Sequence, residues 1–132
     1  MDRTTYIDIG GKKYPMRFSL GASIQMGKKY GSLVDMQKSM QESTLDKQIE
    51  TIMWILELLI KQGCAYKNLF ETNVPIPEDA PVEDGKYIPP SREAMEIGID
   101  LLEAKDKIYA CMGVGSKREV EAESKEKNVK AM

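Results

Sequence analysis

The chain has 132 residues, of which 42% are hydrophobic, so it can bury one modest core but is too short for two comfortable domains. Its 19 basic and 21 acidic residues give a formal net charge of −2, so no overall positive field attracts a phosphate backbone and we expect no nucleic-acid partner. Histidine is absent, which excludes serine–histidine and cysteine–histidine nucleophile chemistry and removes the commonest nitrogen ligand of zinc.

Residues 5–18 have the pattern of a β-hairpin. Polarity alternates on both sides of the glycine pair at 10–11, a dipeptide that tolerates the positive φ angles of a tight turn. With a two-residue loop, Asp8 faces Lys13 and Ile7 faces Tyr14. Charge pairing and apolar pairing therefore favour the same register.

Two short helices follow, at about 20–30 and 33–42. Ser19 is a good N-cap for the first and Gly31 a good terminator. Ser32, followed three positions later by Asp35, resembles a capping box for the second. The predicted apolar stripes are Leu20, Ile24 and Gly27 in the first helix, and Leu33, Met36 and Met40 in the second.

The strongest helical signal covers residues 45–71, with a cap at Ser43 or Thr44. We expect this segment to be the central helix, apolar on nearly all sides in its second half, with Gly63 as a possible interruption and residues 66–70 as either a continuation or a separate turn. Its 3.6-residue stripe consists of Leu45, Ile49, Ile52, Met53, Leu56, Leu59 and Ile60.

The remaining chain predicts a proline-rich surface loop at 73–90, a helix at 92–112 and a charged tail at 114–132 that is disordered or only partly helical. We therefore predict one folded domain over residues 1–113. Its fold class is mainly α with a small N-terminal β-hairpin (α+β), arranged as a compact bundle of about four helices. The predicted inward residues of the last helix are Ala94, Ile97, Leu101, Leu102, Ile108 and Cys111.

The candidate functional residues form a partner-binding set and not a catalytic one. Methionines in the helices provide either an adaptable surface for a partner helix or core filling, and Trp54 is either an interface anchor or buried under the hairpin. No residue pattern predicts a catalytic site, a metal site or a cofactor, so we expect a binding protein and not an enzyme. The candidate set is Met36, Met40, Trp54, Tyr66 and Phe70.

The most apolar stretch, residues 52–60, is less than half of the roughly 20 residues that a membrane-spanning helix needs, so no membrane partner is expected. Cys64 and Cys111 lack the short spacing of a metal knuckle or a redox pair. No secretory leader is recognisable at the N-terminus. We therefore expect reduced thiols and a cytoplasmic location.

The order of features at 9–18, followed by a short helix that ends in the segment at 29–33, resembles the tail assembly chaperones of siphophages and of prophages of Gram-positive bacteria. The resemblance covers the hairpin through the central helix, and more loosely the loop and the last helix. It implies that the chain binds the tape-measure protein, keeps its apolar helices soluble, and yields to the tail tube protein during assembly in the host cytoplasm. It also implies self-association and no catalytic residues. The alternative is a structural virion or head-tail joining component.

Overall fold

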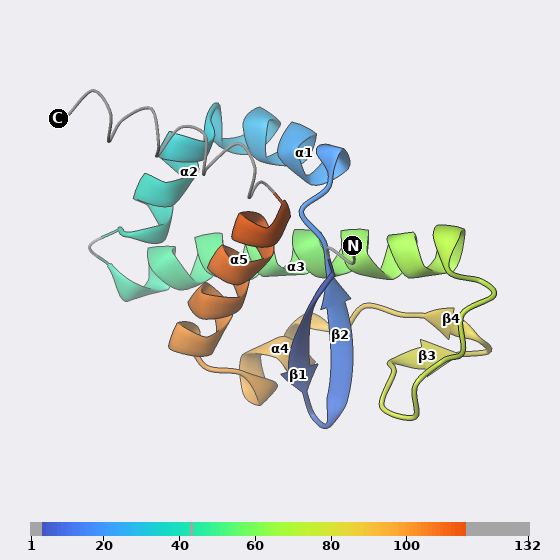
Figure 1. Ribbon diagram of the computed structural model, residues 1–132. Coiled ribbons are helices and arrows are strands. Elements are labelled where there is room, and N and C mark those ends of the chain that lie inside the picture. Colours follow the sequence, from blue (N-terminus) through green and yellow to red (C-terminus); the bar gives the residue numbers. More distant parts are fainter. Residues whose placement is uncertain (1–3, 43, 116–132) are drawn as a thin grey trace, which may run out of the picture.

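The computed structural model describes residues 4–42 and 44–115, and within this part five helices surround one hydrophobic core (Figure 1). Hairpin strands β1 (Thr5–Ile9) and β2 (Lys12–Met16) precede α1 (Leu20–Tyr30), α2 (Leu33–Met40) and the long α3 (Leu45–Phe70). A small second hairpin, β3 (Val82–Glu83) and β4 (Lys86–Tyr87), leads to α4 (Arg92–Gly98) and α5 (Leu101–Gly115). The predicted class, mainly α with a small N-terminal β-hairpin, is confirmed.

The N-terminal hairpin has the predicted register. Asp8 pairs with Lys13 and Ile7 with Tyr14 around a turn in which Gly10 and Gly11 have φ angles of 60° and 84°. Because L side chains rarely adopt positive φ, the glycine pair fixes both the turn and the register.

The edge of β2 that does not pair with β1 faces α3 and the loop that follows α3. The Lys13 amide donates to the Asp79 carbonyl (2.9 Å) and the Arg17 amide donates to the Leu59 carbonyl (3.0 Å). Between them stands Pro15, which has no amide to donate and whose backbone lies directly against Gly63 of α3. The hairpin is therefore attached both to the central helix and to the loop that follows it.

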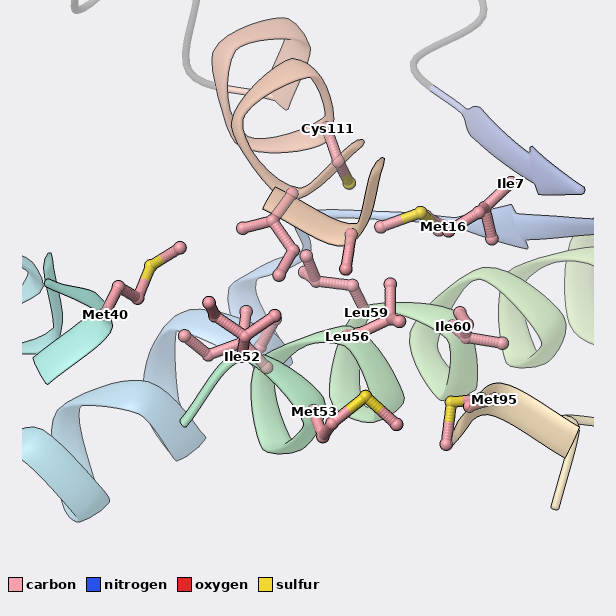
Figure 2. Packing of buried hydrophobic residues seen from close by; sticks show 14 of the residues in the cluster. Ile7, Met16, Met40, Ile52, Met53, Leu56, Leu59, Ile60, Met95 and Cys111 are labelled. Atoms are coloured by element: carbon pink, nitrogen blue, oxygen red, sulfur yellow. The ribbon is translucent and has the colours of Figure 1, made fainter. Parts of the chain in front are cut away.

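The long helix α3 lies at the centre of the fold. It continues without a break through Gly63 and contacts β2, α1, α2, α5 and β4, which explains why its sequence is apolar on several faces. Figure 2 shows Leu56 and Leu59 on the side that faces the hairpin and α5, the elements that carry Met16 and Cys111. Met53 lies on the other side of the helix.

Two predictions on α1 and α3 need correction. The buried residues of α1 are Ala22 and Met26, and the predicted stripe at Leu20 and Ile24 faces outward. Leu45, the first residue of the predicted stripe of α3, is also exposed. The N-cap position of α3 is Thr44, without a side-chain cap bond.

The predicted helix at 92–112 is two helices. Ile99 between them is extended (φ −137°, ψ 156°), and the Asp100 carboxylate accepts a hydrogen bond from the Glu103 amide (2.8 Å), as an N-cap does. The change of direction exposes Ile97 and Leu102, which were predicted to face inward, while Ile108 is buried. The described residues therefore form five helices, and α5 continues to Gly115, past the predicted end at 112. The rest of the predicted tail, 116–132, lies outside the described residues.

The loop predicted at 73–90 contains ordered structure. Asp84 and Gly85 form a turn with φ angles of 52° and 80° between β3 and β4. The side chain of Asn68 in α3 bonds to both backbone groups of Tyr87, accepting from its amide (2.8 Å) and donating to its carbonyl (3.0 Å). This part of the loop is thus fastened to the central helix and is not a free arm.

Candidate partner-binding surface

The five candidate residues lie in three separate places. Met36 and Met40 belong to a groove between α2 and α5, and Trp54 belongs to the contact between α1 and α3. Tyr66 and Phe70 lie side by side near the C-terminal end of α3, with ring centroids 5.2 Å apart and planes at 44°. The five residues chosen from the sequence therefore do not form one continuous surface.

The methionine groove is an apolar depression with a volume of about 250 Å³. None of its lining residues carries a charge. Its volume is below the range usual for small-molecule sites, so it suits one or two side chains of a partner better than a cofactor. Thioethers adapt their shape to an incoming group at little cost. The groove is lined by Phe18, Leu33, Met36, Gln37, Met40, Tyr109, Met112 and Gly113.

Met36 and Met40 form the floor of this groove and are fully buried in the described chain. Of the two interpretations of the helical methionines, core filling holds for these two residues, because α2 packs its inner face against α3 and α1. The accessible rim includes Leu33, 43% exposed, and Tyr109, 44% exposed. A partner would contact the rim first and would reach the two thioethers only by entering the groove.

Trp54 holds α1 against α3. Its ring meets Tyr30 edge-to-face, with centroids 5.5 Å apart and planes at 81°, and the Lys29 ammonium lies 5.0 Å from its centroid. Trp54 is half-buried and lies under α1, not under the hairpin. It also borders a depression of about 230 Å³ beside Glu57 and Lys61, which pair at 3.0 Å.

Tyr66 and Phe70 differ in accessibility. Tyr66 is half-buried beneath the Arg17 guanidinium, which lies 3.6 Å from its ring centroid, whereas Phe70 is 71% exposed. Phe70 is therefore the one candidate side chain that is open to a partner as it stands. The neighbouring exposed apolar residues are Leu69, Val74 and Ile76.

The buried polar groups hold the fold together. Lys67 donates to Glu71 (2.8 Å) and lies 5.2 Å from the Tyr6 ring, which ties the end of α3 to the hairpin. Burial lowers the pKa of Lys67, but its hydrogen bonds with Glu71 and Tyr6 outweigh that effect and raise the pKa above the usual value. Its ammonium is thus a stable cation and not a general base.

Both cysteines are buried free thiols, and burial raises the pKa of each to about 12. Because the thiolate is the reactive form, neither thiol is activated as a nucleophile at neutral pH. Within residues 4–42 and 44–115 no three potential metal ligands of the cysteine or carboxylate type come together. None of the described helices has the length and apolar character required to cross a bilayer.

Sequence reasoning missed the exposed apolar residues of α1 and of the α4–α5 corner. A second stripe, Ala22–Met26–Tyr30 at i, i+4 and i+8, was present as a signal for the buried face of α1. Asp100 followed by Glu103 was a capping signal for the start of α5.

The chain was compared with protein-family models, with curated proteins and with solved structures, and no match was found in any of the three.

Proposed function

We propose that this chain is a tail assembly chaperone of a phage or prophage, which binds the tape-measure protein in the host cytoplasm and keeps it soluble until the tail tube protein assembles. The role needs affinity for apolar helices and no catalytic residue. The observation that carries the proposal is the methionine groove, an uncharged depression with a flexible floor, open between two helices.

The groove suits an amphipathic helix, which binds through a few apolar side chains at i, i+3 or i+4 spacing. Its methionine floor (Met36 and Met40, with Met112 at the side) can adjust to different aliphatic groups, which favours binding of many similar helical segments over binding of one sequence. Exposed Phe70 at the other end of α3 offers a separate apolar contact. Several weak contacts of this kind allow the partner to be released during assembly.

A structural virion or head-tail joining component is the second candidate. The exposed apolar residues favour it as well, because subunit interfaces also bury such groups. The two functions differ in time: a chaperone leaves before the particle is complete, whereas a structural component remains in it.

The test is co-expression with the tape-measure protein from the same gene neighbourhood, with the partner's soluble fraction and co-purification as readouts. We expect the wild-type chain to raise both. Leu33→Gln removes an apolar rim residue of the groove and should weaken capture about tenfold, a loss of roughly 1.4 kcal/mol.

Val34→Gln is the matched control, since Val34 is the next residue of α2, is 60% exposed and does not line the groove. Equal losses in both variants would contradict the role of the groove. A wild-type chain that neither binds nor solubilises the tape-measure protein, but is found in purified particles, would replace the chaperone with the structural component.

A further inference from the structure

Helix α1 presents an apolar face to solvent on the side opposite the core. Leu20 is 80% exposed and Ile24 is 49% exposed, while Ala22 and Met26 are fully buried. At about 100° per residue, Leu20, Ile24 and the residues at 27–28 fall within roughly 100° of arc. This outer face of α1, defined as Leu20, Ile24, Gly27 and Lys28, is separate from the methionine groove, none of whose lining residues belongs to it.

The outer face is held in a fixed orientation. At the start of α1 the Ser19 hydroxyl accepts from the Ala22 amide (3.0 Å) and donates to Gln62 of α3 (2.5 Å). At the end of the helix Tyr30 and Lys29 contact the Trp54 ring. Because both ends are attached to α3, a partner would meet a preformed surface and not a helix that must first be ordered.

Nothing in the described part of the chain explains the glycine at position 27. It is helical and exposed, its φ is not positive, and a Cβ placed on it would meet nothing within 4 Å. Glycine is the least favourable residue in a helix after proline, so its presence there costs stability. Together with Leu20 and Ile24 it forms a face with a flat site, where the backbone of another helix can come close.

The charge of α1 is of one sign. The helix contains Lys28 and Lys29 and no carboxylate. Asp35 of α2, whose carboxylate lies near Gly31, offsets part of this charge. The apolar corner between α4 and α5 has the opposite character, with Asp100 and Glu103 beside exposed Leu102. Apolar contact at Leu20 and Ile24 next to lysines therefore selects for partners that carry carboxylates.

We propose that the outer face of α1 is a second docking site, which binds an amphipathic helix of another protein whose apolar stripe is flanked by aspartate or glutamate. The stripe lies on Leu20 and Ile24, the partner backbone approaches at Gly27, and the flanking carboxylates pair with Lys28 at the C-terminal end of α1.

The test measures binding of the full chain to two synthetic helical peptides with the same leucine stripe, one flanked by glutamates and one by lysines, by fluorescence anisotropy at low salt. We expect the glutamate peptide to bind at least about tenfold more tightly, and added salt to reduce the difference. Gly27→Leu should weaken binding of that peptide at least about tenfold by blocking close approach. The same change favours the helix, so the thermal midpoint should stay equal or rise.

Lys28→Glu should remove the preference for the glutamate peptide, while Ile97→Gln, at a residue of α4 that is 79% exposed, should leave it unchanged. Equal binding of both peptides, no binding of either, or undiminished binding by Gly27→Leu would overturn the proposal. Sedimentation of the chain alone supplies a further check: self-association that Gly27→Leu abolishes would make a second copy the occupant and would likewise overturn it.

Discussion

Among the described glycines, Gly63 is the one whose surroundings leave the least room for a Cβ atom. A Cβ placed there would lie 2.2 Å from the Pro15 carbonyl oxygen, 2.4 Å from its carbon and 2.7 Å from the Met16 nitrogen. All three atoms belong to the backbone of β2, which cannot rotate away as a side chain would. We therefore predict that Gly63→Ala destabilises the protein, although alanine favours a helix by about 1 kcal/mol.

The magnitude follows from the contacts. To restore ordinary contact the strand must withdraw by about 1 Å from α3, which strains the packing at a cost of about 1–3 kcal/mol. The same movement weakens the hydrogen bond from the Arg17 amide to the Leu59 carbonyl, worth about 1 kcal/mol. After the gain in helix propensity, the net loss is about 1–3 kcal/mol, or a fall of roughly 4–15 °C in Tm.

The assay is urea unfolding followed by circular dichroism, with Gly113→Ala as the matched control. Gly113 is also helical, but a Cβ there meets nothing within 4 Å, so alanine should stabilise the protein by about 0.5–1 kcal/mol. Opposite signs for the two substitutions are expected. If Gly63→Ala were as stable as the wild type, the close approach of β2 to α3 would be refuted.

Three further predictions concern hydrogen bonds and ionisation. Ser19→Ala should lower the free energy of unfolding, measured in urea, by about 2 kcal/mol, because the hydroxyl caps α1 and also bonds to Gln62. The control, Ser91→Ala, removes only the exposed cap of α4 and should lower it by about 1 kcal/mol. Equal costs would contradict the second bond. Asn68→Ala should speed hydrogen exchange of the Tyr87 amide by about tenfold or more, because the amide loses its acceptor; an unchanged rate would contradict that role.

Because burial raises the pKa of both thiols, we also predict that the protein loses stability at alkaline pH. Their pKa rises from 9.0 to about 12 on folding, so the stabilisation is fully present below pH 9 and declines by about 1.4 kcal/mol per pH unit for each thiol as the pH rises toward 12. Unfolding midpoints measured from pH 7 to 11 should fall above pH 9, and Cys64→Ala should reduce that slope; a slope unaffected by the substitution would be inconsistent with this assignment.

The sequence predicted the elements whose signals are local. The glycine pair at 10–11 fixes the N-terminal hairpin and its register, and the long periodic run at 45–71 specifies the central helix nearly to its ends. The break at Ile99 also had a local signal, in Asp100 and Glu103, which the apolar spacing of the flanking residues outweighed. Local sequence signals were thus sufficient to predict those elements whose structure depends mainly on their own residues.

For α1 the local pattern offers two candidate buried faces and does not choose between them. Leu20 and Ile24 form one stripe and Ala22 and Met26 another, and hydrophobicity alone favours the first. The fold buries the second because Ser19 bonds to Gln62, and a Cβ on Gly21 would come within 2.9 Å of the same side chain. That contact joins residues more than 40 positions apart, so it is invisible to local periodicity. The same applies to Met36 and Met40, whose burial depends on the packing of α2 against α3 and α1.

The exposed apolar residues have a common consequence. They occur on the outer face of α1, at the rim of the methionine groove, near Phe70 and at the α4–α5 corner, hence on several sides of one core. A formal net charge of −2 gives little electrostatic repulsion between molecules, so such surfaces favour association if nothing covers them. A single tight interface would concentrate these residues in one patch. Their distribution over separate small sites instead favours several weak contacts, which is what the proposed chaperone role would require.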